Sequence, residues 1–155
     1  MENSISAKVL IVLGSDSDRE RIKKLPEILD WFGIEYDIAI SSAHRTPEKT
    51  AEIAKKAGSD GYSVIIAAAG MAAHLPGVIA AYSSLPVIGL PLDASALKGI
   101  DALYSIVQMP PGVPVAAVGI NVAVNAGVLA ARIIALGNER IAIKLQEFTA
   151  QGSKI

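Results

Sequence analysis

The sequence contains no cysteine among its 155 residues. This absence excludes a disulfide framework, a thiolate nucleophile, and a zinc or iron–sulfur site held by cysteine. It fits a reducing compartment, and we expect the protein to be cytoplasmic. The chain has only two histidines, and they show neither the His-x-x-x-His nor the His-Glu spacing of helical metal sites. We therefore expect no bound metal.

Charge is scarce in this chain as well. Charged residues make up 19% of the sequence, and the formal net charge at pH 7 is −1. No excess of basic residues is present to attract nucleic acid or an anionic membrane surface. We therefore expect neither nucleic acid nor a membrane as a partner.

Apolar residues make up 52% of the chain, yet long hydrophobic runs are missing. The two long uncharged stretches, 61–92 and 102–131, are interrupted by polar residues, Gly or Pro, and neither contains an unbroken apolar run of ~18 residues. The first segment, Met1–Ala7, carries Glu2 and lacks the basic start of a signal peptide. We expect a soluble protein that buries part of its apolar surface by associating with copies of itself.

The length corresponds to about one domain, at ~150 residues per domain. We expect a single domain over residues 1–155, with a core over about 8–136 and a C-terminal helical extension over about 138–150. Ile141, Ile143, Leu145 and Phe148 give this extension its apolar character. We expect the C-terminal helix to pack on a neighbouring subunit.

Five short apolar runs predict β-strands. They are continuous, with no alternation of apolar and polar positions, which is typical of parallel strands covered on both faces. The five runs are Lys8–Leu13, Glu35–Ile40, Ser63–Ala69, Pro86–Leu90 and Pro114–Ile120. Helical patterns lie between them, at Arg19–Phe32, Thr46–Ala57, Ala72–Ser83 and Val122–Ala135. This alternation predicts an α/β fold, a three-layer doubly wound parallel sheet of the flavodoxin-like or Rossmann-like type.

Individual residues mark the ends of the predicted helices. Gly33 follows the first helix and is expected to form its C-terminal cap. Pro26 lies inside the same helix and is expected to kink it or to cost a hydrogen bond. Thr46 and Pro47 are expected to cap and to begin the second helix.

Ligands of doubly wound sheets bind at the carboxyl ends of the strands, near the point where the strand order reverses. The loop after the first predicted strand is Gly14-Ser15-Asp16-Ser17-Asp18. Its hydroxyls and backbone N–H groups suit a phosphate, but ordinary helix capping explains the same residues. The loop matches neither G-x-G-x-x-G nor the Walker pattern. Since two carboxylates lie where a phosphate would bind, at least one must face elsewhere, and one of them suits sugar hydroxyls.

The loop after the second predicted strand, Ser41–Pro47, contains the residues best suited to acid–base chemistry. Arg45 supplies a cation of the kind that grips phosphate. His44 carries an imidazole, which exchanges protons near neutral pH. A surface His-Arg pair beside a helix cap is the alternative interpretation of this loop.

The loop after the third predicted strand is built mostly from small residues between Ala67 and Gly77. Small residues let the backbone approach a ligand closely. His74 lies here, and a structural histidine is the alternative to a catalytic one. Met71 is interpreted as a packing residue. The proline-dense stretch 101–114 is interpreted either as a rigid lid or as a connection between elements.

Four motifs, taken together and in this order, resemble the class I PurE family of purine biosynthesis mutases. The resemblance extends from about Val9 to Leu136. The motifs are Gly14-Ser15-Asp16-Ser17-Asp18, Ser42-Ala43-His44-Arg45-Thr46-Pro47, Ala72-Ala73-His74-Leu75-Pro76-Gly77 and Ser105-Ile106-Val107-Gln108-Met109-Pro110.

The resemblance implies one reaction. N5-carboxyaminoimidazole ribonucleotide becomes 4-carboxyaminoimidazole ribonucleotide, because the carboxyl group leaves the exocyclic nitrogen and is recaptured at ring carbon C4. The family uses no metal, nucleotide or biotin, so no cofactor is expected. Its members are octamers with sites at subunit contacts, so we expect a homo-octamer that binds a small-molecule ribonucleotide.

The resemblance also implies roles for individual residues. His44 is the general acid and base, and Asp18 binds the ribose hydroxyls. The phosphate contacts are Ser15, Ser42 and Arg45, with Ser17 nearby. Gly14 and Ala43 lie beside the substrate. The pocket that holds carbon dioxide is shaped by Gly70, Ala72, His74 and Leu75.

Three residues depart from the family pattern. Met71 stands where many members have a second glycine, and Pro111 replaces a basic residue or glycine found in some. Pro26 is unusual in the first helix, but it is distant from the expected chemistry. Related class II carboxylases lack an intact Ala-His-Leu-Pro-Gly run, which this chain has at Ala73–Gly77, so class I is favoured. A class II-like carboxylase, a non-catalytic nucleotide or sugar-phosphate binding module and a structural oligomer remain as alternatives.

Overall fold

The computed structural model describes residues 5–154, so the expectations placed on Met1–Ser4 and on Ile155 lie outside the described residues. Its centre is a sheet of parallel strands in the order β2-β1-β3-β4-β5. The strands are β1 (Lys8–Leu13), β2 (Glu35–Ile40), β3 (Val64–Gly70), β4 (Val87–Leu92) and β5 (Ala116–Ala117). This is the flavodoxin-like order, in which the strand order reverses between β1 and β3. The predicted α/β fold is confirmed.

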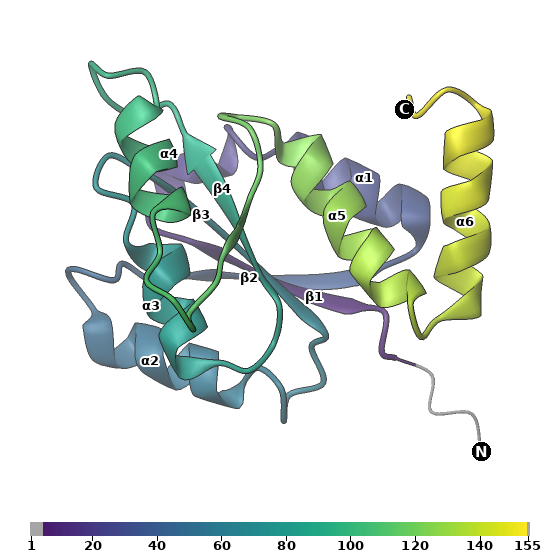
Figure 1. Cartoon of the computed structure of the whole chain (residues 1–155), viewed down its shortest axis with the longest axis horizontal. Coiled ribbons are helices and arrows are strands. Elements are labelled where there is room, and N and C mark those ends of the chain that lie inside the picture. The colour runs from purple at the N-terminus through teal and green to yellow at the C-terminus, as the bar shows by residue number, and fades with distance from the viewer. Residues whose placement is uncertain (1–4, 155) are drawn as a thin grey trace.

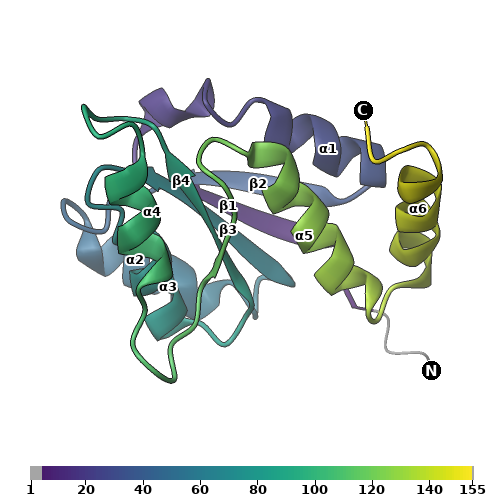
Figure 2. The ribbon, with the colours of Figure 1, turned by 45° about the horizontal axis from the view of Figure 1, so that its top comes forward.

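Helices cover both faces of the sheet. They are η1, a 3-10 helix (Asp16–Arg19), α1 (Lys24–Phe32), α2 (Pro47–Lys56), α3 (Leu75–Tyr82), α4 (Ile100–Val107), α5 (Ala123–Ala135) and α6 (Glu139–Ala150). Figures 1 and 2 show α1 and α5 on one face, and α2, α3 and α4 on the other. The molecule therefore has the three layers that the sequence predicts.

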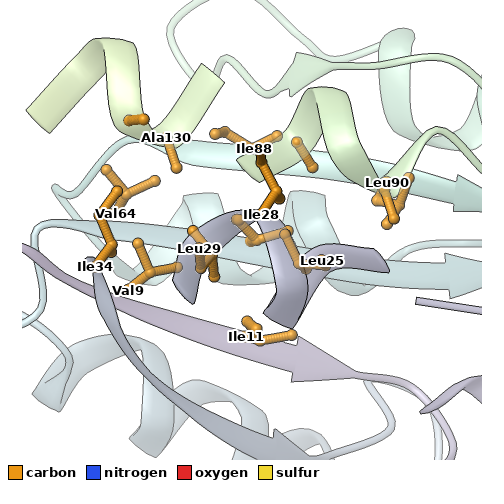
Figure 3. Close-up of a cluster of buried hydrophobic side chains, with 14 of the residues drawn as sticks. Val9, Ile11, Leu25, Ile28, Leu29, Ile34, Val64, Ile88, Leu90 and Ala130 are labelled. Carbon is orange, nitrogen blue, oxygen red and sulfur yellow. The ribbon is translucent and has the colours of Figure 1, made fainter. Parts of the chain in front are cut away.

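The continuous apolar strands follow from this covering. Side chains alternate between the two faces of a strand. In β1, Val9, Ile11 and Leu13 therefore pack with α1 and α5, while Leu10 and Val12 pack with the helices on the opposite face. Figure 3 shows the first of these two cores, where Val9 and Ile11 lie near α1. Val9–Leu13 are therefore buried on both faces of the sheet, and the one polar residue of β1, Lys8, lies half-buried at its start.

The first helix differs from its prediction. Helix α1 begins at Lys24 instead of Arg19, and η1 and a turn occupy the residues before it. Pro26 is consequently in the first turn, where a backbone N–H has no partner within the helix. The expected kink was therefore wrong, because the ring replaces a donor that the helix does not use. Gly33 caps the helix in the left-handed conformation (φ 68°), as predicted.

Three other elements differ in extent. Strand β5 has only two residues, because only Ala116 and Ala117 pair with β4, and Pro114, at the predicted start, offers no N–H. Helix α3 begins at Leu75, after a turn in which Met71 has a positive φ of 56°. Helix α4 lies in the stretch interpreted as a lid or connection. Its exposed face is apolar, with Ile100 and Tyr104 exposed, whereas its polar residues Asp101 and Ser105 are half-buried, which is the reverse of the usual helical pattern.

The C-terminal helix packs within its own chain. Ile141 and Phe148 of α6 are buried in the core with α1 and α5, and Phe148 lies 5.3 Å from Phe32 between ring centroids. Asn138 caps the helix by accepting a hydrogen bond from the backbone N–H of Ile141. Packing on a neighbouring subunit stays a prediction for the outer face of this helix. Among residues 5–154, the structure contains no helix with the length and apolarity needed to cross a membrane.

Candidate active site

A cavity of about 540 Å³ lies at the carboxyl ends of β1, β2 and β3. Every residue predicted for the site from the sequence lines it. These residues are Gly14, Ser15, Ser17, Asp18, Ser42, Ala43, His44, Arg45, Gly70, Ala72, His74 and Leu75. The position agrees with the general rule for doubly wound sheets, because the loops after β1 and β3 diverge where the strand order reverses.

The serines of the first loop form a small capping structure. The Ser15 hydroxyl accepts a hydrogen bond from the backbone N–H of Ser17 over 3.4 Å, and the two hydroxyl oxygens are 2.9 Å apart. The helix that follows is η1, a single 3-10 turn, so the dipole of a long α-helix is absent here. Anion binding at this loop would therefore depend on hydroxyls and local N–H groups.

The two carboxylates of this loop face different surroundings. Asp16 is exposed and forms an ion pair with Arg19 over 2.7 Å, while Asp18 is buried and lines the cavity. Burial raises the pKa of Asp18, and the nearby Arg21 guanidinium and the Ser15 backbone partly oppose this rise. Asp16 is thus the carboxylate that faces elsewhere.

Arg21 is a cavity residue that the sequence reasoning missed. Its Nη1 lies 3.4 Å from Oδ1 of Asp18, and it lines the same cavity. A spacing of three residues places two side chains on one side of a helical turn. That spacing from a candidate site carboxylate is the signal by which the sequence indicates Arg21. Ala69, Met71 and Ala94 are further lining residues outside the predicted set.

The second loop is held by its own hydroxyl groups. The Thr46 hydroxyl donates to the Ser42 carbonyl (3.1 Å) and accepts from the Ser42 backbone N–H (3.2 Å). The Ser42 hydroxyl accepts from the backbone N–H of Arg45 (3.2 Å). Thr46 and Pro47 begin α2 as predicted, although the Thr46 side chain bonds back to the loop and not to the helix. These bonds fix the loop that carries His44 and Arg45.

The third loop places the second histidine beside the first. Nε2 of His44 lies 2.7 Å from Nδ1 of His74, and the ring centroids are 4.8 Å apart in an edge-to-face arrangement. One ring must donate and the other accept, so this hydrogen bond requires that one of the two nitrogens is unprotonated. The tautomers of His44 and His74 are therefore linked through this hydrogen bond.

Gly70, the last residue of β3, lies very close to the loop that follows β4. A Cβ added at Gly70 would lie 2.4 Å from the Cβ of Ala94, so a side chain does not fit there. Ala94 follows β4 and lines the cavity. The last residue of β3 is therefore glycine, because the β4–α4 loop packs directly against it.

The fourth motif lies on the far side of His74. A second cavity, of about 610 Å³, is lined by residues of α3, α4 and the segment after α4, including His74, Ser105, Gln108 and Met109. His74 is the residue that the two cavities share. Among the described residues, no group of three or more His, Cys, Asp or Glu side chains is arranged to hold a metal ion.

Comparison with known proteins identifies the family. N5-carboxyaminoimidazole ribonucleotide mutase of Thermotoga maritima is 55% identical over 141 residues, 91% of this chain and 82% of that protein. Phosphoribosylaminoimidazole carboxylase of Schizosaccharomyces pombe is 51% identical over 92% of this chain, which corresponds to 26% of that protein. A crystal structure of Treponema denticola PurE has a TM-score of 0.85 at 33% identity, covering 94% of this chain and 91% of that one. The AIR carboxylase family matches residues 8–154, and this chain belongs to that family.

Proposed function

We propose that this protein is an N5-carboxyaminoimidazole ribonucleotide mutase of purine biosynthesis, which moves a carboxyl group from the exocyclic nitrogen to ring carbon C4. The observation that carries the proposal is the His44–His74 pair, which lines one cavity together with Arg45 and the site serines. Relatives identical at more than half of the aligned positions carry the mutase name, which supports the same activity here.

The substrate's two polar parts match different sides of the cavity. Ser15, Ser42 and Arg45 bind the phosphate, since hydroxyls donate to it and the guanidinium neutralises it. Asp18, the buried carboxylate, accepts hydrogen bonds from the ribose hydroxyls. This assignment leaves the imidazole ring of the substrate beside the two histidines.

His44 moves one proton in each half of the reaction. It protonates the carbamate nitrogen, the nitrogen–carbon bond breaks with its electron pair remaining on nitrogen, and carbon dioxide is released. C4 then attacks carbon dioxide to form the new carbon–carbon bond, and His44 removes the C4 proton, which restores the aromatic ring. One group can perform both transfers because an imidazole accepts and returns a proton near pH 7. Atoms and protons balance, and His44 returns to its starting state.

Recapture requires that carbon dioxide stays in the site. Gly70, Ala72 and Leu75 form a wall of small or apolar groups at the end of β3 and the start of α3. Such a wall excludes water. Holding the released molecule beside C4 makes the second bond-forming step nearly unimolecular.

The proposal includes a cytoplasmic homo-octamer, as the family resemblance implies. The lack of cysteine fits a reducing compartment. Exposed apolar side chains in α4 and just before it support association between copies of the chain. They are Leu97, Ile100, Tyr104 and Val107. Analytical ultracentrifugation is expected to give the mass of eight chains, and a monomer at micromolar concentration would contradict this part.

The decisive experiment mixes the purified, chelator-treated protein with N5-carboxyaminoimidazole ribonucleotide and follows the absorbance of the C4-carboxylated product. Product must form without ATP, metal or added bicarbonate. Product only from aminoimidazole ribonucleotide plus bicarbonate would instead favour a carboxylase, the activity named for the fission yeast relative. The His44→Asn variant is expected to bind substrate but not to convert it. Full activity in His44→Asn would contradict the assignment of both proton transfers to His44.

A further inference from the structure

Arg21 connects the loop after β1 to the loop after β4, and residues of both loops line the cavity. Its Nη1 lies 3.4 Å from Oδ1 of Asp18, in the first loop, and its Nε donates to the backbone carbonyl of Asp93 over 3.1 Å. Asp93 begins the loop that follows β4, seventy-two positions away in the sequence. The guanidinium therefore links the buried carboxylate to the loop that follows β4.

The Arg21 contact favours the ionised form of the buried Asp18. Asp18 is only 5% exposed, and burial raises its pKa, whereas the Arg21 charge acts in the opposite direction. An ionised carboxylate only accepts hydrogen bonds, and its two oxygens can take both hydroxyls of a sugar diol. Arg21 bonds to Oδ1, and no side chain of residues 5–154 donates a hydrogen bond to Oδ2. Arg21 thus fixes one oxygen and leaves the other without a side-chain donor.

The other end of the contact holds the cavity wall. The Asp93 carbonyl receives the Arg21 hydrogen bond, and the Asp93 backbone N–H donates to the Asn121 side chain over 3.0 Å. Ala94, the next residue, lines the cavity and packs against Gly70. The position of Ala94 is therefore tied to the same guanidinium that holds Asp18.

We propose that Arg21 is a positioning residue for ribose recognition, which orients Asp18 toward the sugar hydroxyls and holds the β4–α4 loop against the cavity. The inference rests on the proposed function for the assignment of Asp18 to ribose. Arg21 itself does not take part in the proton transfers. Its loss must therefore weaken sugar binding and leave the chemical step nearly unchanged.

The test compares the binding of ribose 5-phosphate and 2-deoxyribose 5-phosphate by titration calorimetry. The wild-type protein is expected to bind the ribose compound about tenfold more tightly, the size of one charge-assisted hydrogen bond. Arg21→Met is expected to reduce that preference to less than about twofold, and Arg21→Lys to keep part of it. The Arg19→Met variant is the matched control, because Arg19 pairs with the exposed Asp16 outside the cavity.

Kinetics give a second measurement. With N5-carboxyaminoimidazole ribonucleotide, Arg21→Met is expected to raise KM about tenfold while kcat changes less than about twofold. A general loss of structure would instead reduce kcat or the folded fraction, which thermal unfolding measures. If Arg21→Met does not fold, Arg21→Gln, which keeps an N–H donor but no charge, must show the same loss of sugar preference.

The outcomes separate this inference from the proposed function. An Arg21-dependent ribose preference in a protein without turnover would support the role of Arg21 and reject the mutase proposal. Turnover together with an unchanged preference in Arg21→Met would overturn the role of Arg21 and leave the mutase proposal standing. A wild-type protein that does not distinguish the two sugar phosphates would also overturn it.

Discussion

Nε2 of His44 and Nδ1 of His74 are 2.7 Å apart, and their rings meet at an interplanar angle of 75°. The two residues come from different strand–helix loops, thirty positions apart. A hydrogen bond between two imidazoles contains one proton, so the doubly protonated pair cannot keep it. His74 therefore orients the His44 ring and influences which of its nitrogens carries a proton.

This relationship predicts the effect of removing His74. His74→Phe keeps a ring of similar size but has no nitrogen, so we expect kcat to fall about 10- to 100-fold, part of what acid–base catalysis contributes. His74→Asn is expected to recover some activity, because its amide can occupy the position of Nδ1. The measurement is kcat for each variant and for the double variant with His44→Asn. If the histidines act as a pair, the double variant is no slower than His44→Asn alone.

The buried carboxylate predicts an unusual dependence of stability on pH. Burial raises the folded-state pKa of Asp18 above the ordinary value of 3.8. Well below pH 3.8, Asp18 is protonated in both the folded and the unfolded state, so burying it carries no charge cost. This cost to the unfolding free energy appears as the pH rises from there through the folded-state pKa. Asp18→Asn removes this cost, so its unfolding free energy relative to wild type should increase between pH 3 and pH 7. Urea unfolding across this range checks the prediction.

Asp37 is the matched control for Asp18, with the opposite sign. The Tyr62 hydroxyl donates to Asp37 over 2.6 Å and Lys8 forms an ion pair with it over 2.9 Å, and these contacts lower the pKa of Asp37. Its contribution is present above the unfolded-state pKa and is lost as the pH falls through the folded-state value. Asp37→Asn should therefore cost most at neutral pH. Parallel slopes for the two variants would contradict both assignments.

Met71 predicts a stabilising substitution. Its φ of 56° lies in the left-handed region, which costs a non-glycine residue about 1–2 kcal/mol, and the side chain is 59% exposed. Met71→Gly is expected to raise the unfolding free energy by about 1 kcal/mol. Ala81→Gly, on the exposed face of α3, is the control and should lower it by about 1 kcal/mol. Denaturant unfolding measures both, and a loss of stability in Met71→Gly would reject the strain argument.

The packing of α6 predicts how much this helix contributes to the stability of the single chain. Phe148 is 4% exposed and meets Trp31 edge-on, with 5.4 Å between the ring centroids. Phe148→Ala is expected to cost about 3–5 kcal/mol of unfolding free energy. Ile143→Ala, in the same helix but 50% exposed, should change stability by less than about 0.5 kcal/mol. A large effect at Ile143 would instead indicate that this outer face is buried against another subunit.

Much of the fold can be predicted because its signals are local. Continuous apolar runs predict β1, β3 and β4 closely, since both faces of those strands are covered. Strand β2 has the predicted bounds, but it lies at an edge of the sheet, and its Glu35 and Asp37 are exposed, so its pattern alternates. The signals fail where tertiary contacts decide. Helix α4 was missed because its outward side chains are apolar, and β5 was predicted too long because only Ala116 and Ala117 of that run pair with β4.

The sequence by itself determined the loops of the site, because residues after successive parallel strands must meet at one edge of the sheet. Every site residue that the resemblance to PurE implies lines the cavity, including His44, Asp18 and Arg45, whereas Arg21 was not predicted. Only the tertiary structure decided which atoms meet. The His44–His74 hydrogen bond and the contact of Arg21 with the Asp93 carbonyl join segments far apart in the chain. Such contacts depend on how helices and strands pack in three dimensions, and local residue patterns do not contain that information.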